Sequence, residues 1–480
     1  MNNKKIITLM ILALVMIMAI GYALFSTTLV INGTSNITGT WNVYFESITT
    51  GTIVGNASNE TTPSVSSTTA TINANLDLPG DSISYEIILK NGGTANAVIE
   101  NIKAEAIGSS AIIYSINGIK IGERLASGET RTITIKIEYD VNTSVLPEET
   151  SKTLIVSINA VQDIGQTITE SEPELVQTEY LSSVILKSNK SYADNIASEY
   201  VKSETGIDFN LTSSDTNGKG LYYTSTNTEN DKKTYYFRGA VDNNYVSFAG
   251  QVWRIVRINE DGSIRLILDK GYTSSKFSEA GTTGVSYMVE EAETGEYNYS
   301  QIYRALENYY YGYSVSNASN TLSSKEAYLA DAGFCNDRSK VNNSYGAYER
   351  LINNRTPQFA CPQTKDLFTK NTNNQGNKLL WASIGLLTID EVVYAGGRAG
   401  IEYSDYYLAN GESWWTMSPY TEGSMFRVTP KGNLFYEYVE NEYSTAEITN
   451  RVRPVINLKS SVTVASGSGI ETDPYVINTN

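Results

Sequence analysis

Histidine is absent from this chain of 480 residues, and cysteine occurs only twice. Without histidine the chain lacks the usual proton shuttle at neutral pH, the commonest metal ligand and the base of Ser-His and Cys-His catalytic pairs. Basic residues are also scarce: 36 Lys and Arg stand against 52 Asp and Glu, and the net charge of −16 disfavours binding to phosphate backbones. We therefore expect no enzymatic activity, no cofactor, no metal site and no nucleic-acid partner.

Tyrosine is the abundant aromatic residue, with 34 copies against 11 phenylalanines. Together with many Asn, Ser, Thr and Gly residues, this composition is typical of adaptable recognition surfaces. At this length the chain is expected to form two or three domains, each with its own apolar core.

The N-terminal segment, residues 1–25, has the pattern of an export signal. Lys4 and Lys5 precede a long uncharged and mostly apolar stretch. Small residues before the bond between Ala23 and Leu24 favour cleavage there, which would release a secreted protein. The stretch is about 20 residues long, roughly what a helix needs to cross a bilayer, so a retained membrane anchor is the alternative. Both readings predict a secreted or cell-surface protein.

The junction Tyr22-Ala23-Leu24-Phe25-Ser26 resembles the Y-A-x-F-S junction of exported biofilm-fibre and camelysin-type proteins. The acidic residue common after that junction is missing, since Thr27 and Thr28 follow. The resemblance implies a mature protein that begins with a free β-strand, which fibre subunits donate to the sheet edge of a neighbour. It therefore makes self-assembly one expected function.

Residues 27–162 alternate apolar and polar side chains, which predicts strands with one face toward a core. The apolar series include Ile37, Trp41, Val43 and Phe45; Ile83, Tyr85, Ile87 and Leu89; Ile133, Ile135, Ile137 and Tyr139; and Leu154, Val156 and Ile158. Turn sequences such as Pro79-Gly80-Asp81 separate them, so the spacing favours an antiparallel sandwich. The pattern resembles the immunoglobulin-type modules of bacterial surface proteins, and its polar faces suit a spacer stalk.

Residues 163–232 are acidic and rich in Ser, Asn and Thr, which predicts a linker. A short helix is expected within it, because a stripe of apolar residues recurs at helical spacing. The stripe consists of Leu181, Val184, Ile185, Ile196, Tyr200 and Val201.

Residues 233–480 are expected to form a mixed α/β head. Apolar runs on both sides of Asp261-Gly262 predict a hairpin, because this pair tolerates positive φ. Helices are predicted over residues 299–309 and after the capping box formed by Thr388 and Glu391.

The run from Trp414-Trp415-Thr416-Met417-Ser418-Pro419 to Arg453-Pro454-Val455-Ile456-Asn457-Leu458 resembles an uncharacterised domain of Gram-positive surface proteins. The signature of that domain is W-W-x-x-S-P, a hairpin and then V-R-P-x-x-x-L, and the likeness covers residues 234–460. It implies a fold similar to C-type lectins and formylglycine-generating enzymes, and it implies no activity. The expected fold class is β-rich and multidomain, with an Ig-like antiparallel β-sandwich followed by a mixed α/β C-type-lectin-like domain.

Cys335 and Cys361 predict a disulfide, because the chain is expected to be exported and its cysteine count is even. The formylglycine-generating enzymes work through a pair of reactive cysteines, so an oxidase-like enzyme is a less favoured alternative. Low-pKa cysteines need a cationic or helix-start environment that the sequence does not demonstrate. Glycosidase chemistry with paired carboxylates needs no histidine, but no motif locates such a pair among the 52 acidic residues.

Adjacent residues of a strand face opposite sides of its sheet, so Trp414 and Trp415 cannot both face a one-sided core. An exposed indole ring here could stack on a sugar, while neighbouring tyrosines and charged side chains add contacts. The candidate ligand-binding residues are Trp414, Trp415, Tyr406, Tyr407, Arg427, Tyr436, Glu437 and Tyr438. The alternative is that a helix or loop covers the second face and buries both indoles.

These expectations combine into an exported cell-surface binding protein. It would be an adhesin, with a carbohydrate- or protein-binding head on a stalk. Its expected partners are an extracellular glycan or protein ligand and, through the N-terminal segment, the membrane. The alternative function is a structural fibre or surface-layer subunit that assembles through its N-terminal strand.

Overall fold

The computed structural model describes residues 40–143, 150–189, 207–278, 284–288, 297–313, 321–341, 344–370, 376–439 and 450–479, with the backbone alone of 26–27, 202–203 and 289–290. The chain forms two compact units, Met1–Glu179 and Tyr180–Asn480. Both units are rich in strands, in antiparallel and mixed sheets, which confirms the expected β-rich multidomain class. Among the residues described, no helix is long and apolar enough to cross a membrane, and the predicted leader and its cleavage position lie outside them.

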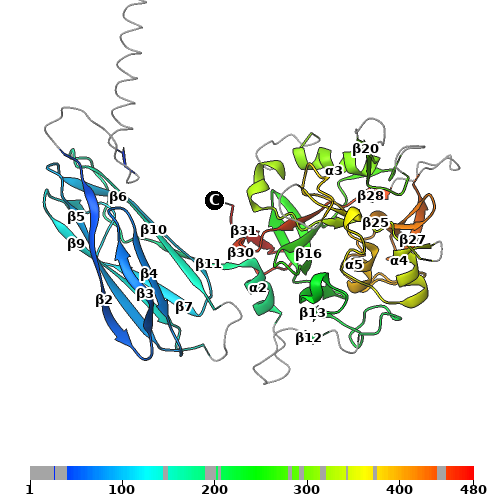
Figure 1. Ribbon diagram of the computed structural model, residues 1–480, viewed down its shortest axis with the longest axis horizontal. Helices are drawn as coiled ribbons and strands as arrows, with labels where there is room; N and C mark the ends of the chain where they lie inside the picture. The colour runs from blue at the N-terminus through cyan, green and yellow to red at the C-terminus, as the bar shows by residue number, and fades with distance from the viewer. Residues whose placement is uncertain are drawn as a thin grey trace, which may run out of the picture. The chain divides into compact units, whose positions relative to one another are not determined.

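The first unit consists of two sheets and a hairpin (Figure 1). One sheet is antiparallel in the order β2 (Val43–Val54), β5 (Ser82–Asn91), β9 (Thr130–Tyr139) and β7 (Ile112–Asn117). In the other sheet, β10 (Lys152–Gln162) pairs with β6 (Ala97–Gly108), which also pairs with β8 (Arg124–Leu125) and β11 (Leu175–Tyr180). The short strand β1 (Ser26–Thr27) pairs with the outer edge of β10, and β3 (Ser58–Val65) and β4 (Ala70–Asn75) form the hairpin.

Strand alternation places the apolar side chains of both sheets in one core. The buried members include Ile83, Tyr85, Ile87 and Leu89 of β5, Ile133, Ile135 and Ile137 of β9, and Ile99 and Ile102 of β6. The strands predicted from period-two alternation are therefore confirmed for these segments, because each series occupies one face of its strand.

A buried carboxylate organises the turn that precedes β5. Asp81 Oδ2 accepts the backbone N–H groups of Asp77 and Leu78, each at 2.9 Å, and Asp81 Oδ1 accepts that of Asn56 at 3.0 Å. These backbone donors, Leu78 and Asn56 foremost, hold the pKa of Asp81 below its ordinary value. The predicted turn at this position thus depends on an ionised aspartate.

The segment 163–232 is not the linker that its composition predicts. Its described residues contribute β11 to the first unit, and they contribute helix α2 (Leu181–Ser188) and strand β13 (Gly220–Thr224) to the second. The predicted short helix is confirmed over α2, whereas Ile196, Tyr200 and Val201 lie outside the described residues. Strand pairing uses backbone groups that every residue carries, so a polar composition does not prevent it.

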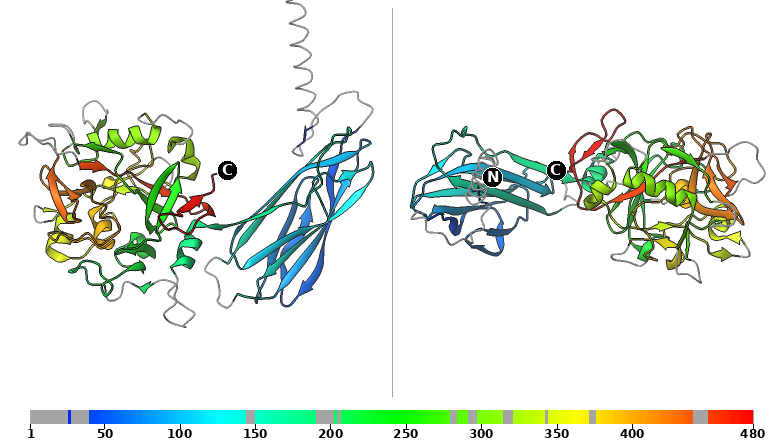
Figure 2. Two further views of the ribbon diagram at one scale, coloured as in Figure 1. Left: turned by 180° about the vertical axis from the view of Figure 1, so that it is seen from behind. Right: turned by 90° about the horizontal axis from the view of Figure 1, so that it is seen from above.

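The second unit is built on a large central sheet and a five-stranded sheet (Figures 1 and 2). The central sheet includes β12 (Lys202–Ser203), β13, β14 (Thr234–Arg238), β15 (Tyr245–Phe248), β16 (Gln251–Ile258), β17 (Ile264–Leu268), β29 (Val455–Leu458), β30 (Thr463–Ser466) and β31 (Tyr475–Ile477). The five-stranded sheet has the order β18 (Thr273–Ser275), β28 (Asn450–Val452), β25 (Trp414–Thr421), β26 (Ser424–Val428) and β27 (Leu434–Tyr438).

Short elements complete the second unit. Two-stranded pairs are β19 (Met288–Glu290) with β20 (Tyr297–Tyr299), β21 (Phe334–Cys335) with β24 (Leu367–Phe368), and β22 (Lys340–Val341) with β23 (Ser344–Tyr345). Its further described α-helices are α3 (Gln301–Tyr311), α4 (Gly346–Tyr348) and α5 (Ile389–Tyr394).

Three local predictions for this unit are confirmed. Strands β16 and β17 form a hairpin around Gly262, whose φ of +81° suits glycine. Thr388 and Glu391 form the capping box at the start of α5. Cys335 and Cys361 are joined in a disulfide, with Cα atoms 5.7 Å apart.

Ion pairs lie inside the second unit because its central strands are buried on both faces. Glu391 Oε1 accepts Arg265 Nη1 at 2.8 Å and Arg257 Nε at 3.1 Å, and all three side chains are buried. Burial raises the pKa of Glu391, but the two arginines and the backbone N–H of Thr388 outweigh it and lower the pKa. The Glu391 carboxylate, which takes part in the capping box of α5, therefore also neutralises the charges of two arginines of the central sheet.

Candidate functional site

The structure buries the two tryptophans of the predicted site. Trp414 and Trp415 are 0% and 1% exposed, because β25 is the middle strand of a sheet covered on both faces. The guanidinium of Arg453 lies 4.8 Å from the centre of the Trp414 ring. Phe277 packs edge-on against Trp415, whose indole N–H donates to Ser275 O at 2.8 Å. The expectation of an exposed indole here is wrong, and the alternative of two buried indoles is confirmed.

Tyr406 and Tyr407 are buried as well, so as ligand-binding residues they are also corrected. Tyr406 Oη donates to Gly432 O at 2.9 Å, and the guanidinium of Arg254 lies 5.3 Å from the centre of the Tyr407 ring. Burial raises the pKa of both phenols far above the ordinary value. These two tyrosines belong to the core of the second unit.

The other four predicted residues lie on β26 and on the edge strand β27, with Arg427 and Glu437 on one face of this hairpin and Tyr436 and Tyr438 on the other. Arg427 Nε lies 3.6 Å from Glu437 Oε2, because the register of the hairpin makes the two residues diagonal neighbours on one face. Tyr438 is 56% exposed, and half-buried Tyr436 stacks on Tyr420 with ring centres 4.5 Å apart. We call Tyr420, Tyr436 and Tyr438, whose rings are in contact, the β27 surface.

A second aromatic surface runs along α3, and the sequence analysis did not find it. Ser300 caps the helix by accepting the N–H of Tyr303 at 3.1 Å, and Gly312 ends it with a φ of +75°. Residues spaced by four lie on one face of a helix. This spacing aligns the buried Tyr303 with the partly buried Glu307 and Tyr311, and Tyr299, the last residue of β20, stacks on Tyr303.

Trp381 packs at the N-terminal end of this row. Its backbone N–H donates to Tyr303 Oη at 3.4 Å, and Tyr303 stacks on Tyr299 with ring centres 5.0 Å apart and planes inclined by 21°. Burial raises the pKa of Tyr299, and a side-chain hydrogen bond with Trp381 opposes that rise. The indole itself is 61% exposed. We call Tyr299, Glu307, Tyr311 and Trp381, with the buried Tyr303 beneath them, the α3 surface.

Glu307 gives the α3 surface a carboxylate among phenols. Burial raises the pKa of Glu307, and the neighbouring positive charge of Arg304 opposes the rise. The negative charge of Glu307 in turn adds to the raised pKa of Tyr299, Tyr303 and Tyr311, after the larger effect of their burial. One carboxylate therefore lies within electrostatic reach of all three phenols.

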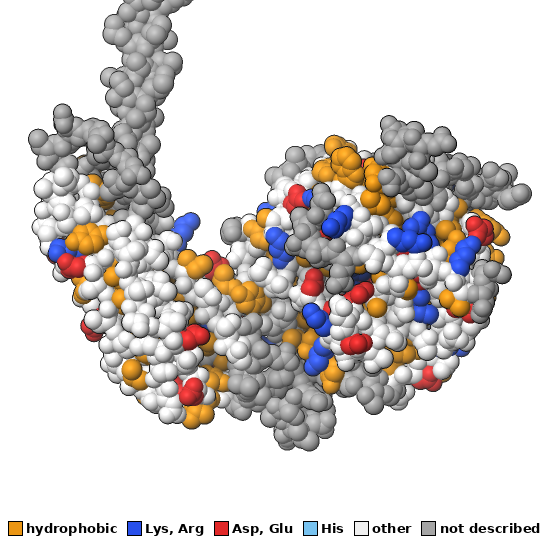
Figure 3. Space-filling view, in the orientation of Figure 1, with side chains coloured by type: hydrophobic (Ala, Val, Ile, Leu, Met, Phe, Trp, Pro, Cys, Tyr) orange, Lys and Arg blue, Asp and Glu red, His pale blue; other side chains and the backbone are white. Residues whose placement is uncertain are grey.

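The α3 surface is on the outside of the second unit. Figure 3 shows a hydrophobic patch over the region where Figure 1 labels α3, and the left view of Figure 2 places α3 at the edge of this unit. The four-residue spacing of its tyrosines and glutamate was a readable signal in the sequence. The position of Trp381 was not, because only the tertiary fold brings the segment before α5 to the start of α3.

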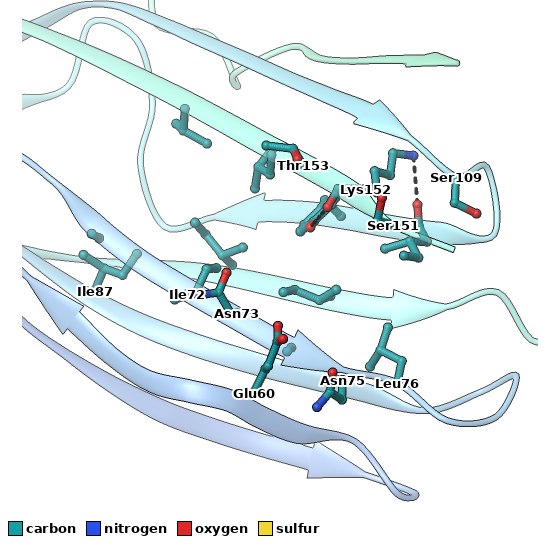
Figure 4. Close-up of a pocket in the computed structure, with 18 of the residues that line it drawn as sticks. Glu60, Ile72, Asn73, Asn75, Leu76, Ile87, Ser109, Ser151, Lys152 and Thr153 are labelled. Atoms are coloured by element: carbon teal, nitrogen blue, oxygen red, sulfur yellow. Dashed lines mark hydrogen bonds between the residues drawn. The ribbon is translucent and has the colours of Figure 1, made fainter. Parts of the chain in front are cut away.

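The first unit contains a cleft of about 780 Å³ between β4 and β10 (Figure 4). Its floor is apolar, and the residues that form it include Ile87, Ile133, Ile135 and Ile137. Its walls include Ile72 and Leu76 from the β4 side and Leu154, Val156 and Ile158 from β10. In Figure 4 the labelled side chains of the β4 segment and of the β10 segment lie on opposite sides of this space.

Buried carboxylates of the second unit are paired with arginines. Besides Glu391, the pairs are Asp390 with Arg350 at 2.9 Å, Asp337 with Arg350 at 2.8 Å, and Asp366 with Arg338 at 2.6 Å. Each of these carboxylates thus neutralises a neighbouring cation inside the fold. Within the described ranges, no three Cys, Asp or Glu side chains are close enough together to hold a metal ion.

Comparisons with protein-family models, with curated proteins and with solved structures find no match for this chain. Its function therefore has to be inferred from the α3 surface, the β27 surface and the cleft.

Proposed function

We propose that this chain is an exported cell-surface binding protein whose second unit binds an extracellular glycan through the α3 surface. The observation that carries the proposal is Trp381, whose indole ring is 61% exposed while its backbone N–H donates to Tyr303 Oη and its side chain hydrogen-bonds with Tyr299. A large apolar ring fixed at a protein surface is a common feature of binding sites, and it suits the apolar face of a sugar.

The polar groups around Trp381 support a sugar rather than a purely apolar ligand. The Glu307 carboxylate and the phenols of Tyr299 and Tyr311 are only partly buried, so they are within reach of solvent and of a ligand. Carboxylates form stronger hydrogen bonds with hydroxyl groups than neutral acceptors do. An aromatic platform bordered by such groups matches the alternating apolar and hydroxyl-bearing faces of a glycan.

The proposal includes the finer fold and location. The first unit would be an Ig-like spacer, supported by its two sheets around one core. The second would be a C-type-lectin-like head, supported by its mixed sheets, short helices and long connections. Residues 1–25 would direct export, and the disulfide between Cys335 and Cys361 is of the kind that persists outside the cytosol.

A glycan array probed with the full chain tests this function. Trp381→Ala is expected to weaken binding at least about tenfold, because it removes the stacking ring. The variant is expected to fold, since the ring is mostly exposed. Tyr438→Ala is the matched control, because it removes an aromatic ring that is 56% exposed on the β27 surface, and it should bind normally.

Two outcomes would overturn the proposal. Binding that survives Trp381→Ala but is lost in Tyr438→Ala would place the ligand on the β27 surface. A folded full chain that binds no glycan of the array, but binds a protein ligand, would exclude the glycan as the ligand class.

A further inference from the structure

Two arginines of the second unit, Arg355 and Arg398, lie close enough for their charges to act on each other. Tyr394, the last residue of α5, brings their segments together. Its Oη donates to Pro357 O at 3.1 Å, and its ring stacks on Phe359 with centres 3.8 Å apart. Arg398 follows Tyr394 by four residues, and Arg355 precedes Pro357 by two. The fold therefore places both guanidinium groups beside the end of α5.

These two arginines have no counter-ion, although a neighbouring arginine has two. Arg350 pairs with Asp337 at 2.8 Å and with Asp390 at 2.9 Å. Within the part of the chain that the structure describes, no carboxylate forms an ion pair with Arg355 or Arg398. Burial and, after it, the positive charge of Arg398 lower the pKa of Arg355, as expected for a like-charged neighbour.

Asp208 is the acidic residue near this pair, and its carboxylate is engaged elsewhere. Asp208 Oδ1 accepts the backbone N–H of Asn210 at 2.8 Å and the Asn210 Nδ2 group at 2.9 Å. These two bonds and, after them, the charge of Arg398 lower the pKa of Asp208. Together with Arg355, the group keeps a net positive charge in a chain whose net charge is −16.

The two arginines also have unused hydrogen-bond donors. The Nε atom of Arg398 is buried and has no hydrogen-bond partner among the described residues, although the side chain as a whole is only half-buried. Arg355, which is also half-buried, donates through Nη1 to Leu351 O. A guanidinium carries five N–H donors, and a buried donor normally has an acceptor. An acceptor is therefore expected beside Arg398.

The backbone of Arg355 is strained. Arg355 follows the π-helix Glu349–Asn354 and has a φ of +56°, in the left-handed region that favours glycine. Backbone strain of this kind and short π-helices are both found frequently at functional sites. The fold thus holds Arg355 in an unfavourable conformation next to a second positive charge.

We propose that Arg355 and Arg398 form a binding site for one oxyanion group of a ligand, a carboxylate, sulfate or phosphate. The planar guanidinium group matches such anions through pairs of N–H···O bonds. The bound anion would accept the buried N–H of Arg398 and would remove the repulsion between the two arginines. The site uses no residue of the α3 surface, so it does not depend on the proposed glycan binding.

Calorimetric titration of the full chain with sodium sulfate, sodium phosphate and sodium acetate tests this site, with sodium chloride keeping the ionic strength constant. The parent chain is expected to bind at least one of these anions in a saturable manner. Arg355→Gln and Arg398→Gln are each expected to weaken that binding at least about tenfold. Arg304→Gln is the matched control, because it removes the same charge from an exposed arginine of α3, and it should bind like the parent.

The three anions also distinguish which group the site takes. Binding of acetate would indicate a carboxylate, whereas binding of sulfate or phosphate without acetate would indicate a tetrahedral oxyanion; either result supports the site. Two results would overturn the proposal. One is a parent chain that binds none of the three anions in a saturable manner, and the other is an equal loss of affinity in Arg304→Gln and Arg398→Gln.

Thermal unfolding separates binding from a purely structural role of Arg398. Without added oxyanion, Arg398→Gln is expected to leave the melting temperature unchanged or to raise it, because it removes one of two like charges. Arg398→Lys keeps the charge but loses the planar fork, so it should fold normally and bind several-fold more weakly. If both variants melted more than about 4 °C below the parent and kept its anion affinity, Arg398 would only support the fold, which would overturn the proposal.

Discussion

Arg453 and Trp414 lie face to face in the core of the second unit, with the guanidinium 4.8 Å from the centre of the indole and both side chains fully buried. Arg453 Nε donates to Leu268 O at 2.9 Å, and Arg453 Nη1 donates to Leu408 O at 3.0 Å. Burial lowers the pKa of Arg453 to about 10, so the guanidinium stays charged at neutral pH. The sequence segments Trp414–Pro419 and Arg453–Leu458 therefore meet in a structural contact.

Arg453→Ala is expected to lower the free energy of unfolding by about 3–5 kcal/mol. The substitution leaves two buried carbonyl groups without their donor and opens a cavity against Trp414. Urea denaturation of the full chain, with hydrogen exchange read in β29, would measure the loss. A change below about 1 kcal/mol would show that the contact is dispensable.

Glu391→Gln should destabilise the second unit by roughly 3–5 kcal/mol, because Arg257 and Arg265 would lose their shared buried counter-ion. The matched control is Glu402→Gln, which breaks an exposed pair with Lys431 and should change stability by less than about 1 kcal/mol. Denaturation curves of both variants measure the two losses of stability. Similar losses would contradict the expectation that the buried ion pairs contribute more than the exposed one.

Reduction of the disulfide between Cys335 and Cys361 should lower the stability of the second unit by about 3 kcal/mol in the chain-entropy model. The first unit contains no cysteine, so its amide exchange should not change. Hydrogen exchange with and without reductant compares the two units in one sample. Equal changes in both units would indicate that the reductant acts through something other than this bond.

The first unit should lose stability in acid because of Asp81. Its folded-state pKa lies below the ordinary value near 3.8, so its contribution is fully present above that pH and is lost as the pH falls through the folded pKa. Asp81→Asn should therefore flatten the decline of stability below about pH 4. Thermal unfolding of both proteins from pH 2 to 6 tests this, and parallel curves would argue against the aspartate.

Tyr299→Phe tests whether a fixed orientation of Trp381 matters for binding. This prediction rests on the proposed glycan function. The variant loses the hydroxyl group that hydrogen-bonds with the Trp381 side chain but keeps the aromatic ring, so glycan affinity is expected to fall about 2- to 10-fold. Tyr436→Phe makes the same chemical change on the β27 surface and should bind like the parent chain. Binding titrations that show no difference between the variants would mean that the indole needs no such support.

Local sequence patterns predicted much of the fold. The alternation in β5 and β9, the Asp261-Gly262 turn and the capping box at α5 all appear in the structure. Each of these features depends on residues that are neighbours in the chain, so pattern and propensity are sufficient to specify it. The segment 163–232 was misread because its polar composition concealed elements whose pairing partners lie elsewhere in the chain.

The candidate site could be predicted only in part. The hairpin register brings Arg427 and Glu437 together, and a pairing between neighbouring strands of a hairpin is predictable from the sequence. The exposure of a ring is not, because it depends on what covers each face of a strand. Trp414 and Trp415 are covered on both faces of β25, whereas Trp381 is left 61% exposed.

The sequence by itself determined the strand-rich elements, the turns between them and the disulfide, because short-range periodicity, turn chemistry and cysteine count set these. Only the tertiary structure decided which aromatic rings face solvent, which carboxylates are neutralised by arginines and where the cleft between β4 and β10 lies. Those outcomes arise from packing between segments distant in the chain, and no local pattern records which segment will cover which face.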